Sequence, residues 1–263
     1  MIPTLSKSGI YNLQGEFLSD INLRLDDIEG FDAVDPFTLV YEILMDPKSG
    51  IFYSLPGDYI SGVRDLAIID SKTKKGKIVK LPEMEKAGNF RVFWNTENGK
   101  ALETEDYSLT LVDDILLVSC AVGSGIYRYD TKTENLEFVD FPHKIIPTEK
   151  SGKILNEVTE ERAFWEEYRK VISQVSYGEL LWDNQTSSYY RLASKTILGE
   201  TMEDTATYEV YLLAYDKELN LLGETSLKDY NQLPQGYFFK DGKLYSYVNF
   251  EDELGFAVFT FDF

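Results

Sequence analysis

Acidic residues are the only chemically active side chains that the sequence holds in large numbers. Aspartates recur between apolar segments, as in "GIYRYDTKTENLEFVDF", residues 125–141. A calcium-binding loop needs oxygen ligands at alternate positions and a glycine for its sharp turn. In this stretch Lys132 stands at the third position of the loop and no glycine stands at the sixth. Lysines also follow Asp70 and Asp216, so we expect hairpin turns at these aspartates rather than metal sites.

The sequence contains one histidine and one cysteine, which limits other kinds of active site. His143, in "FPHK", is expected to be solvated or structural, and Cys120, in "ILLVSCAV", to be a buried and unreactive thiol. A zinc site of His and Cys ligands is nearly excluded, because such sites use several of these residues. No "GxSxG" elbow and no glycine-rich phosphate loop is present. We therefore expect a protein that is not an enzyme and has no cofactor.

The stretch "LLWDNQTSSYYRLA" suggests a binding site. Trp182 and Asp183 end one predicted strand, and Tyr190 and Arg191 lie early in the next. By the two-residue period of a strand, Tyr189 and Arg191 share one face and Tyr190 lies on the other. An aromatic ring near a charged group at a strand end can stack on a sugar or clasp a peptide. Trp182, Asp183, Tyr190 and Arg191 are thus the predicted ligand-binding residues; in the alternative, Tyr190 packs between sheets and Arg191 pairs with an acid.

The elements that must position these residues are hairpins that recur along the chain. In one kind of hairpin an apolar strand runs into an aspartate-containing turn and then into a Tyr- or Leu-rich strand. It covers residues 42–55, 108–120, 179–192 and 237–248. A second kind covers residues 66–81, 125–141 and 211–227, with a shorter form at 9–23. Asp, Asn, Gly and Pro at the turns are what hairpins require.

Two successive hairpins make a four-stranded antiparallel unit, and repeats of such units are typical of a β-propeller. We therefore predict an all-β fold, a single β-propeller domain over residues 1–263, with polar insertions at 83–106 and 197–207. Residues 9–23 would supply two outer strands and residues 235–263 three inner strands. Either the two ends of the chain complete one blade, or the chain lacks amino-terminal blade strands; we favour the second alternative.

One amphipathic helix is predicted as an insertion at residues 156–175. Its apolar residues recur at helical spacing and form a single stripe: Phe164, Trp165, Tyr168, Val171, Ile172 and Val175. We expect this stripe to pack on the edge of a neighbouring blade. The functional alternative is a helix that docks a partner.

The helix followed by "YGELLWDNQTSSYYRLASKT", and the closing "FFKDGKLYSYVNFEDELGFAVFTFDF", resemble a known family. They are similar to the uncharacterised TolB-like, six-bladed β-propeller lipoproteins of Bacteroidetes. The resemblance implies a propeller fold and a location in the cell envelope, in the periplasm or as an outer-membrane lipoprotein. Members carry a lipoprotein leader and further amino-terminal strands, whereas "MIPTLSKSG" has neither a basic nor an apolar leader region.

Composition narrows the choice of partner. The formal net charge is −19, which repels phosphate backbones, so no nucleic-acid partner is expected. No apolar run approaches the ~20 residues of a membrane span. We therefore predict a non-enzymatic binding or scaffold module whose partner is a protein or a glycan. The alternative is a calcium-dependent propeller hydrolase or lactonase, with Ca²⁺ held by carboxylates on the propeller axis.

Overall fold

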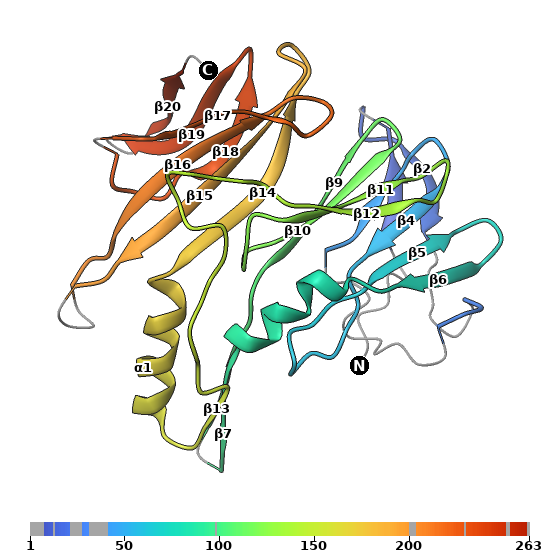
Figure 1. Cartoon of the computed structure of the whole chain (residues 1–263). Helices are drawn as coiled ribbons and strands as arrows, with labels where there is room; N and C mark the ends of the chain where they lie inside the picture. Colours follow the sequence, from blue (N-terminus) through green and yellow to red (C-terminus); the bar gives the residue numbers. More distant parts are fainter. Residues whose placement is uncertain are drawn as a thin grey trace. The chain divides into compact units, whose positions relative to one another are not determined.

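The computed structural model describes residues 8–12, 14–21, 28–31, 42–97, 99–199, 204–228, 230–250 and 253–261. Within these residues the chain is mostly β, built from sheets of two to four strands in which neighbouring strands are antiparallel except for one parallel pair (Figure 1). It divides into two compact units, Met1–Gly88 (unit 1) and Asn89–Phe263 (unit 2). No helix in this described part is long and apolar enough to cross a membrane.

In its described residues, unit 1 holds one hairpin and one four-stranded antiparallel sheet with the strand order β3-β4-β5-β6. The strands are β1 (Ser8–Tyr11), β2 (Phe17–Ile21), β3 (Leu44–Met45), β4 (Ile51–Ser54), β5 (Leu66–Asp70) and β6 (Lys75–Val79). Ile28 and Phe31 pack with Phe52, Ala67 and Ile69 in a buried cluster on this sheet. The sheet coincides with the first complete unit that the hairpin pattern predicts.

The described part of unit 2 holds four sheets and one α-helix, and the 3-10 helix η2 (Pro82–Phe90) leads into it. The first sheet has the order β13-β7-β8, made of β7 (Val92–Thr96), β8 (Gly99–Glu103) and β13 (Glu157–Val158). The second is made of β9 (Tyr107–Val112), β10 (Ile115–Cys120), β11 (Ile126–Asp130) and β12 (Leu136–Val139). The third is made of β14 (Val175–Asp183), β15 (Ser188–Ile197), β16 (Thr207–Tyr215) and β17 (Leu221–Ser226). The last is made of β18 (Gln235–Lys240), β19 (Lys243–Phe250) and β20 (Glu253–Thr260).

The last three sheets of unit 2 pack on one another in chain order. One buried cluster joins β9–β12 to β14–β17 and includes Leu117, Ile126, Tyr189 and Leu213. A second cluster joins the other face of β14–β17 to β18–β20. The first strands of successive sheets also meet, β9 with β14 and β14 with β18. The four-stranded sheets fall where the repeat predicts them; the described residues show stacked sheets and not a closed propeller.

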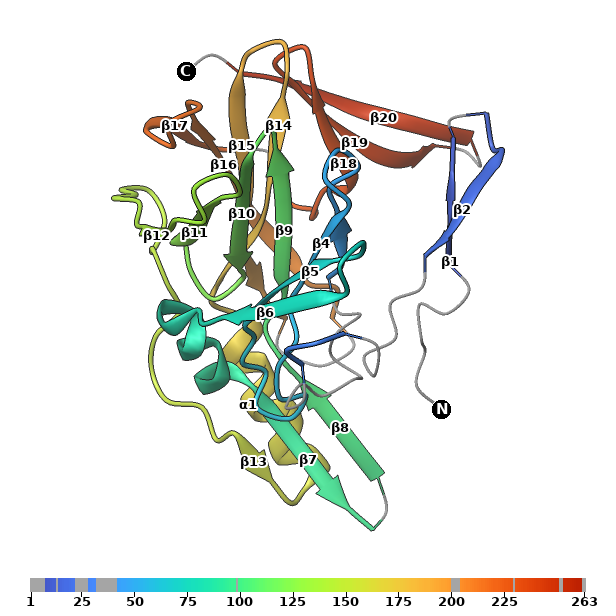
Figure 2. The same cartoon turned by 90° about the vertical axis from the view of Figure 1, so that its right-hand side faces the viewer.

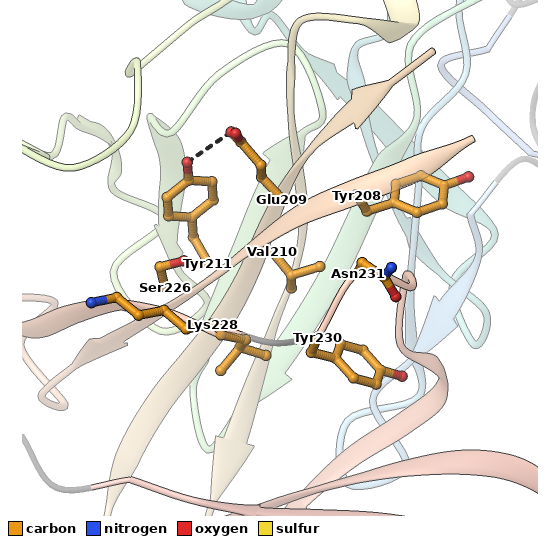
Figure 3. Close-up of a pocket in the computed structure, with 9 residues that line it drawn as sticks. Tyr208, Glu209, Val210, Tyr211, Ser226, Lys228, Tyr230 and Asn231 are labelled. Carbon is orange, nitrogen blue, oxygen red and sulfur yellow. Dashed lines mark hydrogen bonds between the residues drawn. The ribbon is translucent and has the colours of Figure 1, made fainter. Parts of the chain in front are cut away.

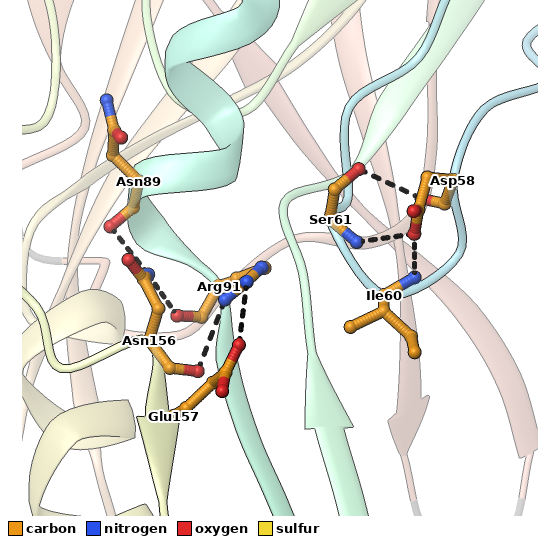
Figure 4. Close-up of polar contacts among 7 residues, drawn as sticks. All are labelled: Asp58, Ile60, Ser61, Asn89, Arg91, Asn156 and Glu157. Atoms are coloured by element: carbon orange, nitrogen blue, oxygen red, sulfur yellow. Dashed lines mark hydrogen bonds and ion pairs between the residues drawn. The ribbon is translucent and has the colours of Figure 1, made fainter.

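The insertion predicted at 83–106 contains a hairpin in its second half, which the sequence analysis did not predict. The strands β7 and β8 pair as a hairpin, and β13 pairs in parallel with β7. Figure 4 shows what holds β13 there: Asn156 Nδ2 donates to the Arg91 carbonyl at 2.7 Å, and Arg91 Nη2 lies 3.3 Å from Glu157 Oε1. Sequence periodicity does not reveal this pairing, because its partners lie more than sixty residues apart.

The helix α1 is present, with narrower bounds than the 156–175 predicted. It spans Glu161–Ile172, because Glu157 and Val158 belong to β13 and Val175 begins β14. Phe164 and Val171 are buried, whereas Trp165 keeps 38% of its surface exposed. The helix contacts β7 and β13, beside which it lies in Figure 2. The helix therefore packs on the three-stranded sheet of unit 2, against its central strand β7 and its edge strand β13, and its packing on the edge of a propeller blade stays a prediction.

Candidate functional site

The aspartates of the hairpin turns use their carboxylates within the turns themselves. Asp130 Oδ1 accepts from the N–H groups of Lys132 and Thr133, both at 2.9 Å. These bonds hold the pKa of Asp130 below its usual value, with the Thr133 bond as the largest cause. Asp70 repeats the arrangement, and in unit 1 Asp58 does so in a loop, where its Oδ1 accepts from Ile60 and Ser61 (Figure 4). The interpretation of Asp70 and Asp130 as turn residues is confirmed.

Arg191, the charged member of the predicted binding site, is 0% exposed. Its Nε donates to the Gly178 carbonyl at 2.6 Å, and its Nη1 donates to the Ser124 carbonyl at 2.6 Å. The guanidinium carbon lies 4.9 Å from the ring centroid of Tyr177. Main-chain carbonyls and an aromatic face therefore surround the charge. The sequence analysis had, as its alternative, predicted an acidic side chain as the partner of Arg191. Arg191 ties β15 to β14 and to the loop after β10.

Tyr190 lies on the opposite face of β15, as the two-residue period predicts. Its ring stacks on Phe239 of β18, with 4.5 Å between centroids and 12° between planes. Tyr190 is 5% exposed and Phe239 is 8% exposed. Tyr189 belongs to the buried cluster on the other face of the sheet. The packing of Tyr190 between sheets is thus what the structure shows.

Trp182 and Asp183 make contacts at the turn between β14 and β15, and Asp183 also bonds to a neighbouring turn. Asp183 Oδ2 accepts from the Gly242 N–H at 2.6 Å, which joins this turn to the β18–β19 turn. The Trp182 ring lies 4.6 Å from that of Tyr189, and its Nε1 donates to Asn184 Oδ1. The four predicted residues therefore point in different directions and do not converge on one opening. Their role in ligand binding stays a prediction, which the burial of Asp183, Tyr190 and Arg191 does not favour.

His143 lies between Glu224 of β17 and Tyr215 of β16. Its Nδ1 is 3.2 Å from Glu224 Oε2, and its Nε2 is 3.1 Å from the Tyr215 hydroxyl. A carboxylate, an imidazole and a hydroxyl in this order form the pattern of a general-base triad. Burial lowers the pKa of His143 and raises that of Tyr215, which is 0% exposed. The hydroxyl is neither ionised nor accessible, so this cluster is structural, as expected for His143.

Two further buried groups are structural as well. Lys150 Nζ lies 2.5 Å from Glu105 Oε1, and both side chains are less than a twentieth exposed. Burial raises the pKa of Glu105 although Lys150 opposes the shift.

Cys120 is a free, buried cysteine. Burial raises the pKa of its thiol to about 12, which confirms the predicted unreactive thiol. In the described part of the chain, no three His, Cys, Asp or Glu side chains gather where they could hold a metal ion.

An open hollow of about 370 Å³ lies at the outer edge of the β14–β17 sheet (Figure 3). It is lined by Tyr208, Glu209, Val210, Tyr211, Ser226, Leu227, Lys228, Tyr230 and Asn231. The hollow exists because the outer edge bulges after β17 ends. The Leu227 N–H donates to the Val210 carbonyl, and the Tyr208 N–H donates to the Asn231 carbonyl. Leu227 and Asn231 are four residues apart in the chain, but their bonding partners Val210 and Tyr208 are only two residues apart in β16.

Aromatic and polar groups alternate around this hollow. Figure 3 shows the rings of Tyr208 and Tyr230 extending to the same side, with the Asn231 side chain between them. The Tyr230 ring is fixed from behind by Phe259, at 4.9 Å and 77°. On the other side the Tyr211 hydroxyl donates to Glu209 Oε2 at 3.1 Å. Burial, followed by this bond, raises the pKa of Tyr211, so its phenol is neutral.

The sequence reasoning did not single out any residue of the hollow. A usable signal is present in "KDYNQ", residues 228–232, where a tyrosine stands among turn-forming residues directly after a strand. Tyr208 and Tyr211 carry no such signal, because in a strand they look like ordinary packing residues. The bulge that brings the two segments together depends on hydrogen bonds between residues about twenty apart in the chain.

The comparisons with known proteins define the family and leave its activity open. Residues 2–226 match the model for a domain of unknown function, DUF4221, so the chain belongs to this family. A crystal structure of a DUF4221 member from Bacteroides vulgatus is 9% identical, with a TM-score of 0.45, covering 85% of this chain and 94% of that one. A GH43 endo-arabinanase from Bacillus licheniformis is 10% identical, with a TM-score of 0.23, covering 90% of this chain and 97% of that one. Both TM-scores are too low to support a shared fold or activity. No curated protein matches the chain.

Proposed function

We propose that the chain is a non-enzymatic binding module built from propeller blades of the TolB-like kind. Two features support the blade arrangement: three four-stranded antiparallel sheets recur along the chain, and in unit 2 the first strands of successive sheets meet. The single observation that carries the binding role is the hollow beside β16. Two tyrosine rings and an amide share one opening there, and none of the three is part of a catalytic arrangement.

The ligand class follows from the groups that line the hollow. Aromatic faces take up the apolar side of a ligand, while the tyrosine hydroxyls and the Asn231 amide provide donors and acceptors. Lys228 is a cation, but Glu209 is an anion that already binds Tyr211 and lies 4.0 Å from Lys195. No single sign of charge dominates, so a charged ligand has no advantage. A neutral, hydroxyl-rich ligand fits best, and we propose a glycan.

Volume and openness agree with a short segment of such a ligand. The hollow, at about 370 Å³, lies near the lower end of the range of roughly 300–1,000 Å³ for ligand sites. It is open along the bulge, so a longer chain of sugar residues can continue beyond it. We propose a location in the cell envelope, in the periplasm or as an outer-membrane lipoprotein, where glycans are available; the resemblance to envelope lipoproteins supports this location.

A thermal-shift screen tests this proposal. Neutral mono-, di- and oligosaccharides are added to the full chain at concentrations up to ~10 mM, and the melting temperature is followed. A ligand that binds the native state alone must raise the melting temperature by mass action. We expect at least one neutral saccharide to raise it in the wild type and not in Asn231→Ala. The proposal is wrong if no saccharide raises it, or if the rise is unchanged in Asn231→Ala.

A further inference from the structure

The hollow beside β16 reaches across the outer edge of its sheet, from one face to the other. Tyr208, Leu227 and Tyr230 pack against the buried cluster between the β14–β17 and β18–β20 sheets. Tyr211, which also lines the hollow, packs against the cluster on the opposite face, between β9–β12 and β14–β17. Strand alternation explains this division, because successive residues of β16 point to opposite faces. A ligand that fills the hollow therefore passes over the edge of the sheet.

The two ends of the hollow differ in chemistry. The first, which we call the aromatic end, holds two rings and one amide: Tyr208, Tyr230 and Asn231. The second, which we call the polar end, holds a carboxylate, two hydroxyls and an ammonium: Glu209, Tyr211, Ser226 and Lys228. Figure 3 shows Tyr211, Ser226 and Lys228 on the opposite side of Val210 from Tyr208 and Tyr230.

The aromatic end suits the apolar face of one sugar ring. Tyr208 and Tyr230 are both half-buried. Phe259 contacts the Tyr230 ring edge to face, and the Tyr208 N–H donates to the Asn231 carbonyl at 2.9 Å, so the two segments are held together. Rings fixed before a ligand arrives lose little freedom when it binds. The Asn231 amide offers donors and an acceptor to the hydroxyls at the edge of a stacked sugar.

The polar end suits the hydroxyls of a second sugar unit. Glu209 Oε2 accepts from the Tyr211 hydroxyl at 3.1 Å and lies 4.0 Å from Lys195 Nζ. The Glu209 side chain nevertheless remains 49% exposed, and Lys228 is exposed as well. A carboxylate accepts hydrogen bonds from hydroxyls and an ammonium donates to them. Neighbouring sugar hydroxyls, which both donate and accept, match this pair of charges.

We infer that the hollow binds two consecutive sugar units of a linear neutral glycan, one at the aromatic end and one at the polar end. This inference rests on the proposed glycan-binding function. A sugar ring stacked at the aromatic end lies on one face of the sheet, whereas Glu209 and Tyr211 leave β16 toward the other face. The linkage between the two units therefore crosses the sheet edge near Val210. The ligand class is an oligosaccharide or polysaccharide, and a monosaccharide fills only one end.

Calorimetric titration of the full chain tests this inference with neutral saccharides of one to four units, built from glucose, galactose or mannose. The wild type should bind a tetrasaccharide at least about tenfold more tightly than its monosaccharide, the effect of one or two good polar contacts. Glu209→Ala combined with Lys228→Ala removes one anion and one cation from the polar end, so the net charge is unchanged. This variant should bind the tetrasaccharide about tenfold more weakly than the wild type does.

Lys217→Ala combined with Glu218→Ala is the matched control. It also removes one cation and one anion, at exposed positions in the β16–β17 turn, and should bind the tetrasaccharide like the wild type. Melting temperatures without sugar show that both variants fold.

Two results would overturn the inference: equal affinity of the wild type for the monosaccharide and the tetrasaccharide, or a polar-end variant that binds the tetrasaccharide like the wild type. Both leave the proposed function in place if Asn231→Ala still weakens binding. If none of these saccharides binds, the proposed function fails and the inference fails with it.

Discussion

The guanidinium of Arg191 donates a 2.6 Å hydrogen bond to the main-chain carbonyl of Ser124, across the boundary between two sheets. The charge is fully buried and has carbonyl and aromatic partners in place of a carboxylate. Its hydrogen bonds satisfy the carbonyls of Gly178 and Ser124. The relationship makes Arg191 a structural connector between β15 and the loop after β10.

Replacing this connector should destabilise the fold strongly. Arg191→Ala leaves the carbonyls of Gly178 and Ser124 unsatisfied and opens a cavity, at a cost of about 3–5 kcal/mol in the free energy of unfolding. Arg162→Ala is the matched control, because Arg162 is exposed and pairs with Glu166 on the surface of the helix α1, and it should cost about 0.5 kcal/mol or less. Urea unfolding measures both. A cost below about 1 kcal/mol for Arg191→Ala would contradict the connector role.

The buried His143 should make stability fall on acidification. Its pKa in the folded chain is below the usual value of about 6.5, with burial as the largest cause and Glu224 opposing it. As pH falls through ~6.5 the unfolded chain takes up a proton at this position and the folded chain does not, so stability is lost. His143→Gln should remove this part of the loss between about pH 7.5 and pH 5.5. Identical pH dependence in variant and wild type would show that His143 titrates freely.

The buried pair Glu105–Lys150 should show strong coupling. Lys150→Met leaves the Glu105 carboxyl buried without its cation and should cost about 3–5 kcal/mol. Glu105→Leu combined with Lys150→Met replaces both charges by apolar groups and should recover most of that loss. A double-mutant cycle in urea gives the coupling energy directly. Additive costs would mean that the two side chains do not depend on each other.

Two adjacent aromatic residues of α1 should differ sharply in their effect on stability. Phe164 is 1% exposed, so Phe164→Ala should cost about 3–5 kcal/mol. Trp165 is 38% exposed, so Trp165→Ala should cost roughly 1 kcal/mol and serves as the control. Similar costs for the two variants would contradict the packing of the helix. A large effect of Trp165→Ala on partner binding alone would instead support the docking alternative.

Calcium should not stabilise the protein. The binding-module proposal assigns no role to a metal ion, whereas the alternative of a calcium-dependent hydrolase requires one on the propeller axis. Melting temperatures are compared at about 1 mM calcium and with chelator, at one protein concentration, because ligands of the native state raise the melting temperature. A calcium-dependent rise of several degrees would favour the hydrolase alternative, and hydrolysis of ester and lactone substrates would then be measured.

Hairpins and turns could be predicted because their determinants are local. Asp46, Asp113 and Asp241 each fall at the turn of a first hairpin, and Asp113 and Asp241 adopt positive φ angles that Asp tolerates. The assignment of Tyr189 and Arg191 to one face of β15 and of Tyr190 to the other also follows from alternation alone. The β13–β7 pairing did not follow, because a two-residue strand has no period to detect. Periodicity likewise extended the helix α1 beyond both of its ends.

Candidate functional residues were harder to predict than structure. Arg191 and Tyr190 look like a binding pair in the sequence because charge and aromatic character stand side by side, but burial is a property of the stacked sheets. The hollow next to Tyr208 and Tyr230 depends on a bulge that joins two separated segments. Sequence patterns report which face of a strand a residue occupies, and they do not report what covers that face.

Direct titration of a saccharide identified in the thermal-shift screen tests the central claim, which is that the hollow binds a glycan. Calorimetry is performed on the wild type, on Asn231→Ala and on Asn135→Ala, an exposed asparagine in the β11–β12 turn that serves as the matched control. Loss of one good polar contact should weaken binding to Asn231→Ala by about tenfold, while Asn135→Ala binds like the wild type. Equal affinity of Asn231→Ala and the wild type would contradict the assignment of the hollow as the binding site.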